Sequence, residues 1–347
     1  MDKNSIYTYL VQHNYSKVME HINTLSNISA DDPILEAIHQ IFMEISIYDK
    51  IDTSHSIYYC FRDTHKIELL LLYCNILSKL KNIIYIGIDF EFNGKQLGLM
   101  QICIFHDKHK HAVLCRPELE FSKDQQDRFI KCFYLNKQFR FILHGSDSLD
   151  MPYIYSIFRH KYHNDFSQFL SRTYDTRFLC EFNKFAKHHA DFKCSLYVAL
   201  LYANAISQSE YENLHKIEHK LYPMYKINWH IINQYIINYA VHDVIHLYDL
   251  FHNLITPHIL SNENTYLIIM DIYHLMILLR CTKLINPTLV HPHKKIDKDI
   301  HNKELMEILY KISTFKTAMT YLDHMSKEEI IILGKQYKLN YLEKLYE

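Results

Sequence analysis

The stretch that decides the fold is IIYIGIDFEF, residues 83–92. Its β-branched and aromatic residues predict a buried β-strand that ends with Asp89 and Glu91. Side chains alternate between the two faces of a strand, so these carboxylates project to the same side. Carboxylates in apolar surroundings are costly to desolvate, and two that lie together repel unless a divalent cation lies between them. The stretch therefore predicts either a metal-binding pair or the solvated end of a strand.

The segments that follow residue 92 predict a mixed α/β domain. Asn93-Gly94 is a strong hairpin signal. Further strands are expected at 97–105, 111–115 and 139–143, and a helix at about 123–133. A three-stranded meander followed by a helix, another strand and more helices predicts a mixed sheet.

Helical patterning continues on both sides of this domain. Apolar residues recur at helical spacing in the N-terminal part, as at Leu35, Ile38 and Phe42, and again in the C-terminal part. A polar, charged linker is expected near residues 291–301. We therefore expect three parts: a helical N-terminal region (1–80), an α/β domain (81–255) and a helical C-terminal region (256–347).

Composition excludes several classes of protein. The chain has 347 residues but only 5 glycines, and it contains neither of the glycine-rich patterns that bind nucleotides in P-loop and Rossmann folds. A net charge of −1 excludes a generally basic coat for nucleic acid but not a local basic patch.

The lack of a visible targeting signal and the scattered cysteines favour a soluble intracellular protein, either cytoplasmic or nuclear. The N-terminus shows no signal-peptide pattern, and the longest apolar stretch, Tyr266–Leu279, is too short to span a bilayer. The 8 cysteines form no CxxC pair, which favours reduced thiols. Abundant Ile, Lys, Asn and Tyr are typical of AT-rich genomes, such as those of large DNA viruses.

A second group of carboxylates follows the strand expected at 139–143. In HGSDSLDMPY, Asp147 and Asp150 lie just beyond the carboxyl end of this strand, where α/β sheets bind ligands. Pro152 is tolerated in the first turn of a helix, so Asp150 is expected near a helix N-terminus. The alternative for Asp150 is a helix-capping role.

A third group lies on a late amphipathic helix, in INYAVHDVIHLYDLF. Tyr239 and Asp243 are four residues apart and therefore share one face of the helix. His242 and His246 lie nearby; a metal site that includes them competes with the simpler interpretation of surface histidines.

Taken in order, these groups resemble the signature of the DEDD superfamily of 3′–5′ exonucleases, in its tyrosine-bearing, ribonuclease D-like branch. Shorter segments match the family as well: LGLMQIC (97–103), ILHG (142–145), YDTRFLC (174–180), CSL (194–196) and Trp229. The resemblance covers about residues 81–254. It implies a ribonuclease H-like exonuclease domain with a mixed sheet.

The resemblance also implies the chemistry. Two divalent cations, Mg²⁺ or Mn²⁺, would be held by Asp89, Glu91, Asp150 and Asp243 to hydrolyse phosphodiester bonds at a single-stranded 3′ end. Tyr239 would orient the attacking water. The spacing from His144 to Asp150 is one residue longer than in the family, so Asp147 remains a substitute for Asp150.

The terminal base of the substrate needs an apolar or aromatic contact, for which the candidates are Phe92, Met100 and His144. RNA is favoured over DNA as the substrate. The alternative function is a catalytically silent exonuclease fold that binds nucleic acid or protein. We expect no membrane association, and the sequence indicates no partner for the helical flanks.

Overall fold

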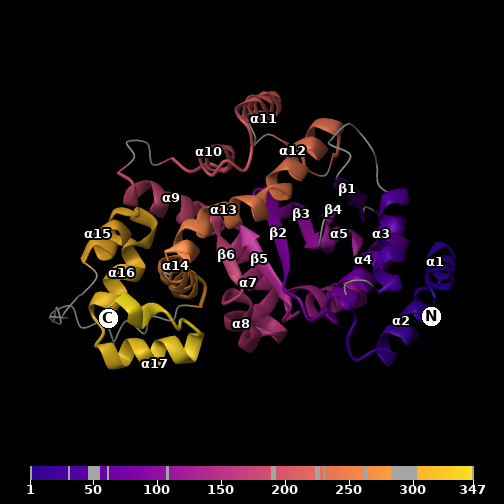
Figure 1. Cartoon of the computed structure of the whole chain (residues 1–347), viewed down its shortest axis with the longest axis horizontal. Coiled ribbons are helices and arrows are strands. Elements are labelled where there is room, and N and C mark those ends of the chain that lie inside the picture. Colours follow the sequence, from indigo (N-terminus) through magenta and orange to yellow (C-terminus); the bar gives the residue numbers. More distant parts are fainter. Residues whose placement is uncertain are drawn as a thin grey trace. The chain divides into compact units, whose positions relative to one another are not determined.

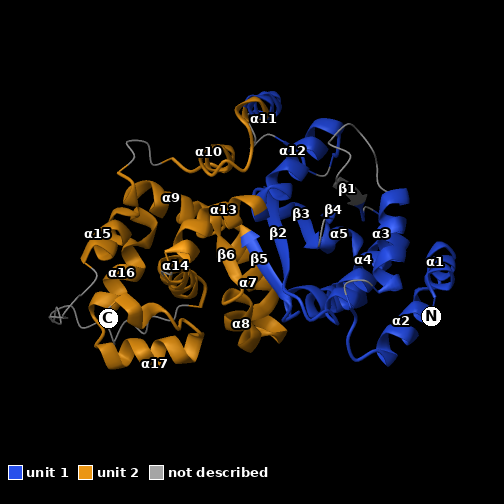
Figure 2. Cartoon of the chain, viewed as in Figure 1, with its two compact units in different colours: residues 1–142, 212–248 blue, residues 143–211, 249–347 orange. Residues whose placement is uncertain are grey.

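The structure is a computed structural model that describes residues 2–29, 32–45, 55–60, 62–106, 109–188, 193–222, 227–229, 231–261, 264–282 and 303–345. The chain forms two compact units (Figure 2). The first consists of Met1–Ile142 and Glu212–Tyr248, and the second of Leu143–Tyr211 and Asp249–Glu347. The chain passes from one unit to the other three times, so neither unit is a single contiguous segment. The division at residues 80 and 255 stays a prediction.

The first unit is built on a mixed sheet (Figure 1). Its described strands are β1 (His55–Tyr59), β2 (Ile84–Asn93), β3 (Gln96–His106), β4 (His109–Cys115) and β5 (Phe139–Leu143). They lie in the order β1-β4-β3-β2-β5. The β2–β3 and β3–β4 pairs are antiparallel, whereas β1–β4 and β2–β5 are parallel. The predicted α/β class and mixed sheet are confirmed.

The hairpin predicted at Asn93-Gly94 joins β2 to β3. Asn93 pairs with Gln96, which leaves Gly94 and Lys95 as the loop. Gly94 has a φ of +66°, a conformation that costs glycine little and other residues more. This glycine therefore allows the tight turn that brings β3 back alongside β2.

Strand β1 corrects the expectation that residues 1–80 are purely helical. It pairs with β4 in parallel, from His55 opposite Lys110 to Tyr59 opposite Leu114. A five-residue strand is too short to show a clear alternation of apolar and polar residues. Its pairing partner lies about 55 residues further along the chain, so no turn signal next to it indicates a strand.

Helices surround this sheet in the first unit. They are α1 (Lys3–Val11), α2 (Tyr15–Thr24), α3 (Pro33–Ile45), α4 (Thr64–Leu77), α5 (Pro117–Glu120), α6 (Lys123–Phe129), a π-helical turn (Ile130–Tyr134) and α12 (Gln234–Ile245). Helix α4 is apolar almost all round, and Asp63 caps its N-terminus by accepting hydrogen bonds from the next backbone N–H groups. Helix α12 packs on β2, β3 and β4, and it carries part of the candidate site.

The second unit is mainly helical. It contains α7 (Asp150–Lys161), α8 (Phe166–Leu170), a short strand β6 (Thr173–Asp175), α9 (Thr176–Ala186), α10 (Leu196–Tyr202), α14 (Thr265–Thr282), α15 (Lys303–Lys311), α16 (Lys316–Asp323) and α17 (Lys327–Tyr337). Helices α11 (Gln208–Leu221) and α13 (Leu247–Leu260) cross the boundary between the units. Residues 303–345 contain α15, α16 and α17, and a separate helical C-terminal region stays a prediction. The linker expected near residues 291–301 lies outside the described residues.

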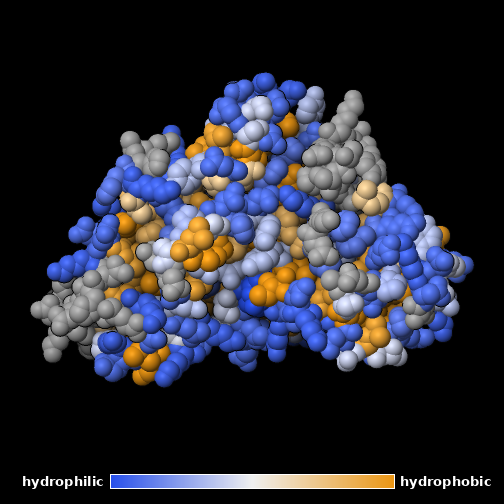
Figure 3. Space-filling model, in the orientation of Figure 1, coloured by the Kyte–Doolittle hydropathy of each residue, from blue (hydrophilic) through white to orange (hydrophobic). Residues whose placement is uncertain are grey.

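Helix α14 is longer than the apolar stretch predicted from the sequence. Its 18 residues are enough, by length and apolar composition, to cross a membrane. This corrects the expectation that the apolar stretch at Tyr266–Leu279 is too short to do so. However, 67% of this segment is buried inside the protein, as in the core helix of a soluble domain. On the face drawn in Figure 3, hydrophilic side chains cover most of the described surface, and apolar residues gather in smaller patches among them.

Two cysteines correct the expectation of reduced thiols. Cys180, in α9, and Cys194, just before α10, form a disulfide with a Cα–Cα distance of 6.2 Å. The two residues are 14 positions apart, a separation that matches no local cysteine motif. Six other cysteines form no disulfide in the described part of the chain, as expected.

Candidate active site

The first two carboxylates of the candidate site lie near the end of strand β2. Asp89 and Glu91 are both half-buried, and they are two residues apart on the same face of the sheet. The β2–β3 pairing is regular as far as Glu91 and then shifts between Glu91 and Phe92. Such irregularities re-aim side chains at the end of a strand. The strand therefore presents two carboxylates where its regular pairing stops.

Helix α12 supplies the third carboxylate. The Asn233 side chain caps this helix by accepting a hydrogen bond of 3.1 Å from the backbone N–H of Ile236. Asp243 is buried, with 5% of its surface exposed, and Tyr239 lies one turn earlier and is half-buried. Both residues thus occupy one face of α12, as the sequence predicted.

Gly87 allows helix α12 to approach the sheet closely. A Cβ atom at this position would lie 2.9 Å from the backbone carbonyl oxygen of Val244 and 3.3 Å from Leu247 Cδ1. Any side chain on residue 87 would therefore push α12 outward. Since Asp243 directly precedes Val244, the missing side chain sets the position of that carboxylate relative to β2.

The three carboxylates converge in the first unit. One oxygen from each of Asp89, Glu91 and Asp243 lies within 4.8 Å of the others. Burial raises the pKa of Asp89 to about 7, because the ionised form is poorly solvated there. A hard divalent cation such as Mg²⁺ or Mn²⁺ takes carboxylate ligands of this kind and would stabilise the ionised form.

Gln101 is a further residue of this site. From the sequence it was noted only as part of the family-like segment LGLMQIC. It lies on β3 directly opposite Asp89, so both side chains are on the same face. Its side chain is fully buried, and neither its Nε2 nor its Oε1 has a hydrogen-bond partner within the protein. A buried amide without a partner costs about 1–3 kcal/mol. The amide of Gln101 could hydrogen-bond to a water molecule held by a cation at the three carboxylates. A lone glutamine in the apolar stretch LGLMQICIF is the sequence signal for it.

Trp229 supports Tyr239 from the neighbouring loop. Its backbone N–H donates a hydrogen bond of 3.3 Å to Asn93 Oδ1, and its ring centroid lies 6.0 Å from that of Tyr239. A Cβ at Gly98 would lie 2.6 Å from the Trp229 Cβ, so only glycine allows this packing. Trp229 is 98% buried, so its ring is held in place beside the ring of Tyr239.

The two apolar candidates for substrate contact on this sheet differ in accessibility. Phe92 is half-buried, and its ring centroid lies 6.4 Å from that of Phe90. Met100 is only 1% exposed, and the Tyr134 hydroxyl donates to its Sδ at 3.8 Å. Met100 therefore packs in the core, and we leave it out of the proposed substrate site.

The remaining predicted residues lie in the second unit. Asp150 is the first residue of α7 and is buried, with 8% of its surface exposed. Asp147 accepts a hydrogen bond of 3.2 Å from Arg280 Nη1, and Arg177 Nη1 lies 4.0 Å from it. These two cations face the buried Asp147 carboxylate, whose Oδ1 has no hydrogen-bond partner within the protein.

The loop before Asp150 is held by Asp175. This fully buried carboxylate accepts hydrogen bonds from the backbone N–H groups of Gly145 at 3.0 Å and Ser146 at 2.8 Å, and from the Ser146 hydroxyl at 2.8 Å. His144 is hydrogen-bonded through both ring nitrogens, to the Thr176 hydroxyl at 2.9 Å and the Cys194 carbonyl oxygen at 2.8 Å. The HG segment is therefore fixed by neighbours within the second unit, and the His144 ring is half-buried.

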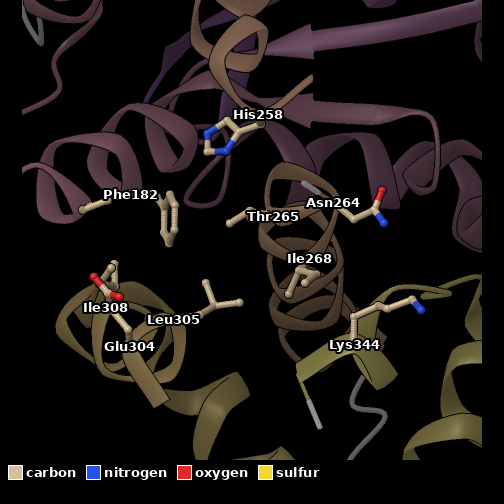
Figure 4. Close-up of a pocket in the computed structure, with 10 residues that line it drawn as sticks. Phe182, His258, Asn264, Thr265, Ile268, Glu304, Leu305, Ile308 and Lys344 are labelled. Atoms are coloured by element: carbon tan, nitrogen blue, oxygen red, sulfur yellow. The ribbon is translucent and has the colours of Figure 1, made fainter. Parts of the chain in front are cut away.

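Two of the pockets in the second unit lie beside helix α9. One, of about 510 Å³, is drawn in Figure 4; its wall combines apolar side chains such as Ile268 and Ile308 with His258, Glu304 and Lys344. No predicted site residue lines it. The other, of about 710 Å³, is lined by His144, Gly145, Arg177, Glu181, Lys193, Cys194 and Ser195. This second pocket therefore opens beside the HG segment.

Comparison with known proteins gives a viral relative. No protein-family model matches the chain. The chain is similar to the uncharacterized protein L533 of Acanthamoeba polyphaga mimivirus, with 26% identity over 288 residues. The match covers 72% of this chain and 56% of the relative, so the chain spans little more than half of the relative's length. A relative in a giant virus agrees with the expectation of a large DNA virus as the source.

Proposed function

We propose that this protein is a metal-dependent 3′–5′ exonuclease that hydrolyses phosphodiester bonds from a single-stranded 3′ end, with RNA favoured over DNA. The observation that carries the proposal is the convergence of Asp89, Glu91 and Asp243 within 4.8 Å, from a strand and a helix about 150 residues apart in the sequence. The resemblance of the motifs to ribonuclease D-like exonucleases supplies the reaction.

The residues of the site have distinct roles in this proposal. Asp89, Glu91 and Asp243 would hold divalent cations, which supply charge stabilisation for the attacking and leaving oxygens. Tyr239 would orient the attacking water, since it lies one turn before Asp243 and is held by Trp229. Phe92 would contact the terminal base by stacking, which tolerates any base. The resemblance assigns the remaining metal ligand to Asp150.

The test is digestion of a labelled single-stranded RNA by the full chain in Mg²⁺ or Mn²⁺. We expect Asp89→Asn and Asp150→Asn to lower the rate by at least about 1,000-fold, because each removes a negative charge that the cations need. Asp147→Asn should leave most of the activity, because Asp147 pairs with Arg280. Glu118→Gln, at an exposed position on α5, is the matched carboxylate control.

Two kinds of outcome would contradict the proposal, and a third would change one ligand of the site. Undiminished digestion by Asp89→Asn, or in the presence of a chelator, would exclude metal-dependent catalysis at this site. Tight binding of the RNA without any cleavage by the wild-type chain would favour the silent binding module instead. Loss of activity in Asp147→Asn but not in Asp150→Asn would exchange the roles of these two residues.

A further inference from the structure

A group of histidines gathers where helix α3 meets the β3–β4 hairpin of the first unit. His109 and His111 are two residues apart on β4 and share one face of the sheet. His106 pairs directly with His109 across the hairpin, which places it on the same face. His39 comes from α3, whose described residues pack against this face. Histidines from distant parts of the sequence therefore meet in one place.

Three of these imidazoles lie within ligating distance of one another. His39 Nδ1 and His111 Nε2 are 2.7 Å apart, and the two ring planes differ by only 13°. The ring of His109 stacks on that of His39, with a centroid distance of 4.2 Å. One ring nitrogen from each of the three residues lies within 4.8 Å of the others. The contact between His39 and His111 requires a proton between the two nitrogens, in a position that a metal ion can take instead.

His111 is the most buried imidazole of the three. His111 is 1% exposed, and its Nδ1 has no hydrogen-bond partner within the protein. A buried ring nitrogen without a partner in the protein can take a ligand, and imidazole is the commonest metal ligand among side chains.

We propose that His39, His109 and His111 form a zinc site. Three imidazoles suit a borderline transition metal, of which Zn²⁺ is the foremost, whereas the carboxylates of the candidate active site suit Mg²⁺ or Mn²⁺. With Zn–N distances of about 2.0–2.1 Å, neighbouring ligand nitrogens lie about 3.3 Å apart in a tetrahedral site. His39 and His111 would therefore separate slightly from their 2.7 Å contact, and the ring of the exposed His109 would turn towards them.

Zinc at this position would connect α3 to the sheet. His39 and His111 are 72 residues apart, so the ion would join the N-terminal helices to the β3–β4 hairpin. Three protein ligands leave one position of a tetrahedral ion for water. The site is independent of the exonuclease proposal, because it shares no residue with it.

The test is zinc binding by the metal-depleted full chain, measured by titration calorimetry and by elemental analysis in excess Mg²⁺. We expect one Zn²⁺ per chain, bound by the wild type and by Asp89→Asn. His109→Gln should weaken binding by at least about 100-fold, since even outer-shell changes at metal sites cost 10–100-fold. His39→Gln should do the same, whereas His215→Gln, at an exposed position on α11, should bind zinc like the wild type.

His109 is exposed, so its replacement should leave the fold intact, which circular dichroism checks. Visible absorption of the Co²⁺-loaded chain distinguishes nitrogen ligands in a four-coordinate site from carboxylates in a six-coordinate one. The proposal is overturned if the wild type binds no zinc in Mg²⁺, if His109→Gln binds it as tightly as the wild type, or if Asp89→Asn abolishes binding.

Discussion

Asp89, in the candidate site, has a pKa far above its usual value. Its pKa is raised to about 7 by burial, whereas an aspartate in an unfolded chain titrates near 3.9. The folded protein therefore holds this proton more tightly than the unfolded chain does. In the absence of metal, the contribution of Asp89 to the free energy of unfolding is largest below about pH 4 and is lost as the pH rises to about 7.

Asp89→Asn should remove this pH dependence. In a chelator at pH 8 we expect the variant to be more stable than the wild type by about 2 kcal/mol, a value reduced for the partial exposure of the carboxylate. The difference should disappear below about pH 3, where Asp89 is protonated in both states. Urea denaturation at several pH values measures it.

Adding Mn²⁺ at pH 8 provides the control for this prediction. The cation should stabilise the wild type and not the variant, because the cation binds the ionised carboxylate. A stability difference that is the same at pH 4 and pH 8 would show that the burial of Asp89 does not control it.

Asp147 and Asp150 could not be told apart from residue type and spacing alone. Both are aspartates beyond the same strand, and spacing alone left them interchangeable. The contacts of Asp147 with Arg280 and Arg177 come from residues 30 or more positions away, which no local pattern reveals. These ion pairs of Asp147 are a property of the folded state and do not follow from spacing along the chain.

At the scale of elements, the site depends on how closely helix α12 packs on strand β2. Gly87→Ala would place a methyl group 2.9 Å from the Val244 carbonyl oxygen. We expect the helix to shift outward, with a loss of about 1–3 kcal/mol in the free energy of unfolding. The shift would also move Asp243 and lower the affinity for Mn²⁺ on the order of 10-fold.

Gly94→Ala is the matched control for this prediction. Its Cβ would meet no atom within 4 Å, but its φ of +66° is unfavourable for alanine. It should therefore lower stability through strain by about 1 kcal/mol and leave the Mn²⁺ affinity unchanged. Equal effects of both variants on Mn²⁺ binding would contradict the role of Gly87. Calorimetric titration with Mn²⁺ and urea denaturation supply the two measurements.

The elements that the sequence predicted well are those with strong local signals. Strand β2 has a run of β-branched residues, the β2–β3 hairpin has Asn93-Gly94, and α12 has an apolar stripe with helical spacing. Strand β1 was missed because it has only five residues and pairs with a distant parallel strand. Local patterns indicate elements, whereas parallel pairing over a long separation leaves no mark next to the strand itself.

At the scale of the whole molecule, the first unit includes the N-terminal residues. The predicted domain 81–255 lacks β1, which pairs with β4, and α4, whose Leu70, Leu71 and Ile76 are fully buried. A fragment of residues 81–255 should therefore fail to fold, since it exposes both the edge of β4 and the apolar surface under α4.

Expression of this fragment beside the full chain tests the prediction. We expect the full chain to unfold cooperatively in urea and the fragment to aggregate or to show no cooperative transition. Cooperative unfolding of an isolated, soluble fragment of residues 81–255 would instead support the boundaries predicted from the sequence.

The sequence by itself determined the α/β class, most of the strands and the chemical character of the candidate site, because alternation, helical spacing and turn residues act over a few neighbouring positions. The tertiary structure alone decided which groups meet. It brought Asp243 to Asp89 and Glu91, placed the unpartnered Gln101 beside them, joined Cys180 to Cys194 and gathered His39 with His109 and His111. These contacts depend on packing between segments far apart in the chain, and packing is a property of the folded protein rather than of any local stretch.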